Sequence, residues 1–304
     1  MKTLAKYQNG NYNVILLEDG TKIRFNDLDN LTPSFPESVD LCISMKCNGG
    51  IGNNLCEFCY ANCTPNGKHA NLNHPILDTL HPGMELAING NDLSHPDLEN
   101  FLIRMKEKGV FTNMTINQKH LYLIDKVKDW QDRGLLYGIG ISLTDSTDEK
   151  LYKAAETLKN VVIHTIDGLL TKEDLDRMSN KNLTILVLGY KKIGRGDRYY
   201  LENKDRIESN IEYLKNNLLS YRNKFRAISF DNLAIEHLDI QSQLPKEVWE
   251  QFYMGDEGSY TFYLDIVNEK FAKSSLETEQ YELLDSIDDM FNFVRGMKKG
   301  EKDD

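Results

Sequence analysis

The chain has 304 residues, of which 40% are hydrophobic, and its formal net charge at pH 7 is −11. That length and composition suit one large α/β domain or two modest ones. The acidic balance argues against general binding of duplex nucleic acid, and no apolar run approaches the ~20 residues that cross a bilayer. The N-terminus lacks the apolar segment of a signal peptide, so we expect a cytoplasmic protein without membrane association.

The first elements predicted along the chain are two β-prone runs within residues 11–25. They flank Glu18, Asp19 and Gly20, which are residues typical of a tight turn. This pattern predicts a β-hairpin, and we assign it to an N-terminal extension covering residues 1–36.

From about residue 39 the sequence alternates short apolar runs with helical patterns. Runs of this length, rich in Val, Ile, Leu and Phe, are typical of buried strands. From the second run to the sixth they begin roughly 23 to 27 residues apart, which fits one strand and one helix per unit. The seven runs are 39–44, 84–88, 111–116, 137–143, 160–164, 183–188 and 225–230. Repeated βα units predict an α/β fold with a parallel sheet, and we favour a partial (βα)6-type TIM barrel over residues 37–240.

The C-terminal residues 241–304 depart from this rhythm. A helix is predicted near 245–252, a strand at 260–265 and a terminal helix from about 277 to 297. We expect this segment to cap the barrel, and not to fold as an independent domain. The stretches 253–258 and 274–275 are read as loops, with a substrate-pocket lining as the alternative.

All five cysteines lie between Cys42 and Cys63, and the 241 residues that follow contain none. A disulfide scaffold spreads its cysteines along a small secreted chain, so this grouping favours a metal centre. Cys42 lies within a predicted strand and is interpreted as a packed core thiol. A structural zinc site built from four of these thiols is one interpretation.

The strand that ends in Lys46-Cys47-Asn48, followed by Cys56-Glu57-Phe58-Cys59 and the aromatic Tyr60, resembles the cluster loop of the radical S-adenosylmethionine superfamily. The usual family interval between the first two cysteines is three residues, whereas Cys47 and Cys56 are separated by eight. The resemblance favours Cys47, Cys56 and Cys59 as the cluster ligands, with Cys63 as an alternative ligand, and a zinc site is the main rival. Stretches at 64–69, 189–196 and 230–234 are also similar to an often phage-borne group within that superfamily.

The resemblance continues at successive strand ends over roughly residues 37–235. It implies that S-adenosylmethionine is bound there by residues that follow the predicted strands. The implied cofactor-binding residues are Tyr60, Asn89, Gly90, Asn91, Asn117, Ser142, Gly168, Gly189 and Lys191.

Membership of this family implies a [4Fe–4S] cluster that reductively cleaves S-adenosylmethionine to a 5′-deoxyadenosyl radical, which abstracts hydrogen from a substrate. It also implies an electron donor such as a flavodoxin or ferredoxin. A nucleotide, a nucleic-acid base, an amino acid or a peptide would all fit as the substrate, and no catalytic residue is assigned. The alternative is a non-catalytic zinc-binding interaction module.

Two further groups stand beside the predicted site. Lys191, Lys192, Arg195 and Arg198 form a basic patch that can clamp a carboxylate or phosphate, and a solvated loop is the alternative. His164 lies at a strand end, where a core histidine and a site residue are equally good interpretations.

Overall fold

The computed structural model describes residues 2–28 and 30–297 and contains a ten-stranded, mostly parallel sheet. The strand order is β10-β9-β8-β7-β6-β5-β4-β11-β12-β13. The parallel strands are β4 (Ser38–Cys42), β5 (Glu85–Asn91), β6 (Phe111–Asn117), β7 (Gly138–Ser142), β8 (Val161–Ile166), β9 (Thr184–Leu188), β10 (Ala227–Phe230) and β11 (Thr261–Asp265). The predicted α/β class and all seven strands of the repeating units are confirmed, and the end strands β10 and β13 are not paired with each other.

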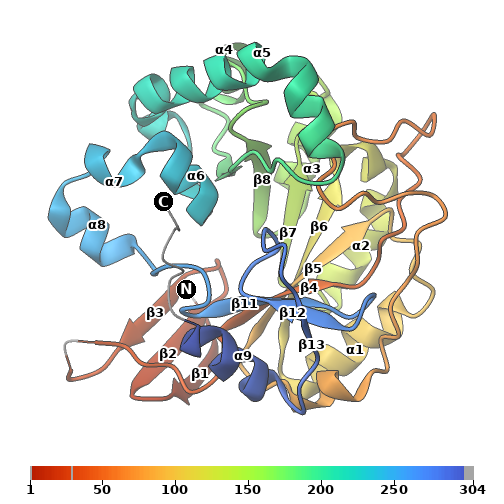
Figure 1. Cartoon of the computed structure of the whole chain (residues 1–304), viewed down its shortest axis with the longest axis vertical. Coiled ribbons are helices and arrows are strands. Elements are labelled where there is room, and N and C mark those ends of the chain that lie inside the picture. Colours follow the sequence, from red (N-terminus) through yellow and green to blue (C-terminus); the bar gives the residue numbers. More distant parts are fainter. Residues whose placement is uncertain (1, 29, 298–304) are drawn as a thin grey trace.

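Helices follow most of the strands and lie along the outer face of the curved sheet (Figure 1). They are α1 (Leu98–Lys108), α2 (Ile124–Asp132), α3 (Glu149–Thr157), α4 (Lys172–Met178), α5 (Arg195–Asn217), α6 (Asn232–Leu238), α7 (Ile240–Gln243), α8 (Lys246–Phe252) and α9 (Ile287–Gly296). Short 3-10 helices η1 (Pro75–Thr79), η2 (Gln118–Leu123) and η3 (Leu218–Lys224) complete the set. None of the helices described is both long and apolar enough to span a membrane.

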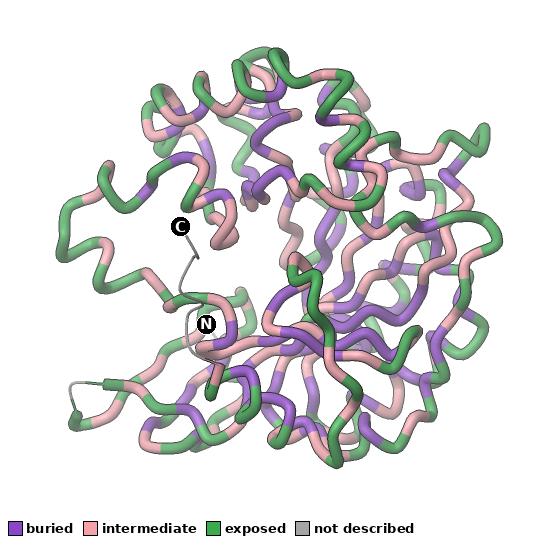
Figure 2. Tube along the Cα trace, viewed as in Figure 1, coloured by how far each residue is buried: buried purple, intermediate pink, exposed green. Residues whose placement is uncertain are grey.

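Side chains alternate along the strands between a buried apolar face and a half-buried, more polar face. On β5 and β6 the buried residues include Leu86, Ile88 and Met114, which join the main core beneath the helices. Asn89 and Asn117 alternate with these buried residues along their strands, so their side chains face the concave side of the sheet. The buried residues of the sheet run through the centre of the molecule (Figure 2).

A separate antiparallel sheet, with strands β1 (Thr3–Asn9), β2 (Tyr12–Leu17) and β3 (Lys22–Phe25), covers the amino ends of the parallel strands. Strands β2 and β3 form the predicted hairpin, and β1 adds a strand that the sequence does not predict. Arg24 makes a two-pronged ion pair with the buried Glu37, and Lys22 contacts Glu85 at 2.5 Å. This sheet leaves the opposite, carboxyl edge open for a site.

The C-terminal segment extends the main sheet. Strand β11 pairs in parallel with β4, and Tyr263 lies beside Asp40. Strands β12 (Lys270–Ala272) and β13 (Tyr281–Glu282) continue the sheet antiparallel. The predicted long terminal helix is wrong in its first half, because α9 begins only after Ser286, whose side chain accepts a hydrogen bond from the Asp289 amide. Residues 298–304, which belong to the predicted C-terminal segment, lie outside the described residues.

Candidate functional site at the carboxyl edge

The cysteine-bearing segment is a closed loop at the carboxyl end of β4. The Cys47 amide donates to the Thr64 carbonyl at 2.9 Å, and the Thr64 amide donates to the Met45 carbonyl at 3.1 Å. Isolated bridges join Ser44 to His69 and Lys46 to Thr64. The two ends of the loop are therefore tied together, and the thiols between them share one region of the molecule.

The eight-residue interval between Cys47 and Cys56 folds back on itself. A Cβ on Gly49 would come within 2.6 Å of the Asn54 backbone, so the beginning and the end of this interval pack closely against each other. Gly49 and Gly50 both have φ near +75°, which glycine adopts without strain. Lys119 donates from Nζ to the Asn54 carbonyl at 2.7 Å. The expanded interval is therefore a compact loop between Cys47 and Cys56.

The five thiols are free, and each interacts electrostatically with at least one other thiol of the group. A hydrogen bond from Cys63 lowers the pKa of Cys59 to about 6, with a further contribution from the nearby Arg195. The same hydrogen bond raises the pKa of Cys63. Burial raises the pKa of Cys47 and Cys56. Cys59 is thus the most acidic thiol of this set.

Cys42 differs from the other four thiols. It is a buried strand residue, and burial raises its pKa to about 12, with a further contribution from the charge of Asp265. An inert thiol of this kind matches the core role predicted for Cys42.

Side-chain nitrogen atoms from neighbouring elements reach the sulfur atoms of the four loop cysteines, in addition to the contact of Asn89 with Cys42. The Asn91 amide at the end of β5 lies 3.5 Å from Cys63 Sγ, and the Asn117 amide at the end of β6 lies 3.5 Å from Cys56 Sγ. His120 Nε2, in η2, lies 3.8 Å from Cys47 Sγ. The strand ends of a parallel sheet therefore converge on the thiols, as the location of α/β sites at the carboxyl edge predicts.

Arg195 holds the cysteine loop from the side of α5. Its Nε donates to the Cys56 carbonyl and its Nη2 donates to the Cys63 carbonyl, each at 3.1 Å. Its backbone amide donates to the Cys59 carbonyl at 3.2 Å. A Cβ on the preceding Gly194 would come within 2.2 Å of the Tyr60 carbonyl, so the two loops are in close contact.

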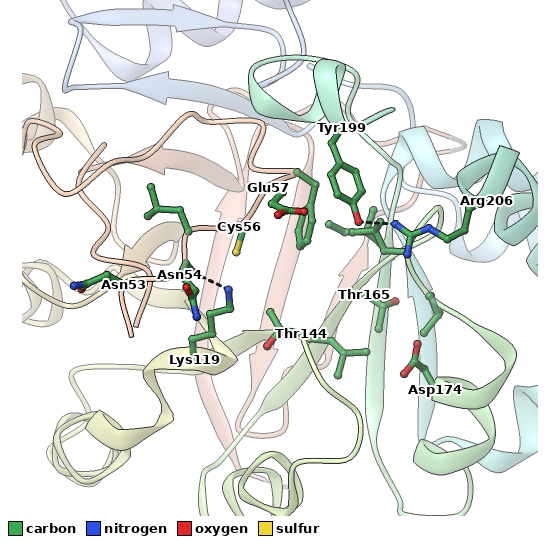
Figure 3. A pocket seen from close by; sticks show the side chains of 16 residues that line it. Asn53, Asn54, Cys56, Glu57, Lys119, Thr144, Thr165, Asp174, Tyr199 and Arg206 are labelled. Atoms are coloured by element: carbon green, nitrogen blue, oxygen red, sulfur yellow. Dashed lines mark hydrogen bonds between the residues drawn. The ribbon is translucent and has the colours of Figure 1, made fainter. Parts of the chain in front are cut away.

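A cavity of about 630 Å³ opens beside Cys56. This volume falls within the ~300–1,000 Å³ typical of small-molecule sites. Figure 3 shows the cysteine loop and Lys119 on one side, and Thr165, Asp174, Tyr199 and Arg206 on the other. Phe58, which lies between Cys56 and Cys59 in the sequence, lines this cavity and packs edge-on against Tyr199 at 5.9 Å between ring centroids.

The predicted residues near the glycine turn of β5 have structural partners. Asn89 accepts a hydrogen bond from the Ile43 amide at 2.7 Å and donates to the Ser44 carbonyl at 2.6 Å. Asn91 donates to the Ser44 and Lys46 carbonyls. Both amides therefore fix the chain just before Cys47. Gly90 faces the core, where a Cβ would come within 2.7 Å of a Met114 side-chain atom.

The other predicted binding residues lie along the same edge. A Cβ on Gly168 would come within 2.5 Å of Ile207, so this glycine allows α5 to pack closely. Gly189 donates its amide to Asp231 at 2.9 Å. Ser142 ends β7 beside His164 of β8.

Lys191 and Tyr60 contact each other beside the cysteine loop. Lys191 Nζ lies 4.2 Å from the centroid of the Tyr60 ring and donates to Ser275 Oγ at 2.8 Å. Tyr60 is 42% exposed, yet desolvation by surrounding atoms raises its pKa. Asp40 is exposed in the same way, and desolvation raises its pKa too. Solvent-accessible side chains that remain desolvated are typical of a concave site.

The charges of three carboxylates act on Lys191, and with it they form what we call the charged group: Asp40, Lys191, Asp231 and Glu257. Burial raises the pKa of Glu257 to about 7, with contributions from the charges of Asp40 and Asp231. Burial lowers the pKa of Lys191. The loop at 253–258, for which a pocket lining is one interpretation, thus places Glu257 in this group.

The predicted basic patch is divided in the structure. Arg195 uses its donors on carbonyls of the cysteine loop, and Arg198 is an exposed side chain paired with Glu202 on α5. Lys192 lies over the ring of Tyr200. Arg195 thus positions the loop and does not clamp an anion.

Phe58, Arg195 and His120 contribute to the site in ways that the sequence does not predict. Phe58 carried a usable signal, because its aromatic ring precedes a candidate ligand, and Arg195 was noted in the predicted basic patch with a different role. Among the residues described, no three His, Cys, Asp or Glu side chains are arranged to hold a single metal ion. A scan against protein-family models finds no match for this chain, and a search of curated proteins finds none either.

Proposed function

We propose that the chain is a radical S-adenosylmethionine enzyme whose curved sheet is a partial (βα)6-type TIM barrel. The observation that carries the proposal is the convergence on one edge of three mutually interacting thiols, Cys47, Cys56 and Cys59, beside a cavity of about 630 Å³. Thiolates are the ligands that iron–sulfur clusters use, and the set is free of disulfides. Three protein ligands leave one iron open for a small molecule.

Cys47, Cys56 and Cys59 would hold a [4Fe–4S] cluster, which would supply the electron for reductive cleavage of S-adenosylmethionine and so enable hydrogen abstraction from a substrate. The residues of this chain position and enclose that chemistry. Arg195 holds the carbonyls of the cysteine loop, and Asn91, Asn117 and His120 direct N–H groups at its sulfur atoms. Hydrogen bonds and burial of this kind set the potential of such a centre.

We propose that S-adenosylmethionine binds in the cavity beside Cys56. None of the nine cofactor-binding residues implied by the family resemblance lines this cavity. Phe58 and Tyr199 supply aromatic surface, and Lys119, Thr165 and Arg206 supply polar groups. Polar and apolar side chains both line the cavity, and the polar groups can orient a charged ligand.

The substrate is placed against the charged group, which adjoins the cysteine loop through Tyr60 and Lys191. Its three carboxylates and one ammonium provide groups that can orient a polar substrate, and a nucleotide, base, amino acid or peptide all remain candidates. A flavodoxin or ferredoxin is the proposed electron donor.

The proposal is tested by anaerobic reconstitution with iron and sulfide, followed by dithionite and S-adenosylmethionine. We expect iron and sulfide to bind and 5′-deoxyadenosine to form, as measured by mass spectrometry. A fully loaded cluster that yields no 5′-deoxyadenosine contradicts the enzymatic proposal. Stoichiometric zinc with no uptake of iron supports the zinc-binding interaction module instead.

A further inference from the structure

His120 is a fully buried imidazole directed at a candidate cluster ligand. It has no solvent-exposed surface, and its Nε2 lies 3.8 Å from Cys47 Sγ. It follows Asn117 by three residues and sits in η2, whose N-cap is the Asn117 side chain. The ring is therefore placed by the end of β6, the same strand that directs an amide at Cys56.

The second ring nitrogen identifies the tautomer. Nδ1 is buried and has no hydrogen-bond partner within the described residues. A proton on Nδ1 would leave a buried N–H without an acceptor and would turn the Nε2 lone pair toward the sulfur. A proton on Nε2 directs an N–H at Cys47 and leaves only a lone pair unmatched at Nδ1. The Nε2–H tautomer therefore has the lower free energy.

We propose that His120 donates this N–H to the Cys47 thiolate and raises the reduction potential of the bound cluster, an inference that rests on the proposed function. A hydrogen bond to a ligand sulfur stabilises the reduced cluster, which carries more negative charge, more than the oxidised one. His120 acts through Cys47 and is thus a positioning and tuning residue, with no direct part in hydrogen abstraction.

The test compares His120→Leu with His120→Gln in reconstituted protein, using dithionite titrations followed by electron paramagnetic resonance. Glutamine places an amide N–H near the position of Nε2, whereas leucine fills the space without a donor. We expect a lower potential for His120→Leu and a potential close to wild type for His120→Gln. His95→Gln is the matched control, because the hydrogen bonds of that buried ring within the described residues go to the Ala70 carbonyl and the Asp97 amide.

Equal potentials for wild type and His120→Leu at equal iron and sulfide content overturn the proposal. A directly coordinated imidazole, seen as strong ¹⁴N coupling that disappears in both variants, overturns it as well. Iron and sulfide are measured first. A wild-type protein that takes up no cluster refutes the proposed function, and this result is distinct from a failure of the His120 proposal.

A second measurement uses the metal-free protein, so it does not depend on whether His120→Leu binds a cluster. Long-range ¹H–¹⁵N spectra of histidine-labelled protein report which ring nitrogen carries the proton, and His120→Gln assigns the signal. We expect the Nε2–H tautomer for His120. An Nδ1–H tautomer leaves Cys47 without this donor and overturns the proposal.

Discussion

The ring of His164 lies directly over Gly140 on the concave face of the sheet. A Cβ on Gly140 would come within 2.4 Å of His164 Cε1 and within 2.8 Å of Thr115 Oγ1. Burial lowers the pKa of His164 to about 4, so the ring is neutral at physiological pH. Glycine at this point of β7 thus leaves the space that a neutral imidazole on β8 occupies.

Gly140→Ala is expected to destabilise the fold by about 1–3 kcal/mol, because the added methyl group must displace the His164 ring. In a His164→Ala background the same change is expected to cost at least about 1 kcal/mol less. Urea denaturation of the four proteins in this double-mutant cycle measures both values.

Gly296→Ala is the matched control for this cycle, since nothing lies within 4 Å of the added Cβ. We expect a change within about 0.5 kcal/mol for it. An equal cost of Gly140→Ala with and without the imidazole would show that the close contact is not with His164.

The strands of the repeating units were predictable because each is a short apolar run that is visible in the local sequence. Leu86 and Ile88, for example, alternate with half-buried residues of β5. Strand β1 was not predicted, since Lys6 and Gln8 interrupt its apolar pattern. The pairing of β11 with β4 joins residues 38–42 to residues 261–265, and no local signal reports a contact over that separation.

The same distinction applies to the candidate site. The thiols, Asn91 and Asn117 follow predicted strands, and a parallel sheet brings such residues to one edge. Arg195 reaches Cys63 across 132 residues of sequence, and its side chain could equally have bound an anion. Its role depends on where α5 begins relative to the cysteine loop, which only the tertiary structure defines.

Arg195→Ala is expected to loosen the cysteine loop. Two side-chain hydrogen bonds to the Cys56 and Cys63 carbonyls are lost, each worth about 0.5–3 kcal/mol. We expect severalfold faster hydrogen–deuterium exchange at residues 56–63 and weaker retention of iron after reconstitution. Arg198→Ala is the control, because that side chain is 85% exposed and pairs only with Glu202 among the described residues. Unchanged exchange in Arg195→Ala would contradict the positioning role.

Cys47→Ala, Cys56→Ala and Cys59→Ala are each expected to abolish uptake of about four irons per chain, because each removes a thiolate ligand. Iron and sulfide assays after anaerobic reconstitution measure the loss. Cys42→Ala is the matched control and should retain the cluster, since its thiol is buried in β4 with a raised pKa.

Cys63→Ala distinguishes the two ligand sets. In the preferred set Cys63 only donates a hydrogen bond to Cys59, so the variant should keep its iron. Loss of iron in Cys63→Ala together with full loading of Cys47→Ala would make Cys56, Cys59 and Cys63 the ligands.

Glu257 is expected to make stability depend on pH. Burial and the charges of Asp40 and Asp231 raise its pKa to about 7, against the opposing charges of Lys191 and Lys273. A raised pKa means that the folded state binds the proton more tightly than the unfolded state. The stabilisation is complete below the unfolded pKa and is lost as the pH rises through about 7.

Between pH 5 and pH 8 the wild-type protein should therefore lose up to about 3 kcal/mol relative to Glu257→Gln, which cannot ionise. Urea denaturation across this range gives the difference between the two proteins, so that other titrating groups cancel. Glu250→Gln, an exposed change on α8 next to Lys246, should follow wild type at every pH. A difference between wild type and Glu257→Gln that stays constant with pH would mean that Glu257 is already ionised at pH 5, and that the charged group does not hold it protonated.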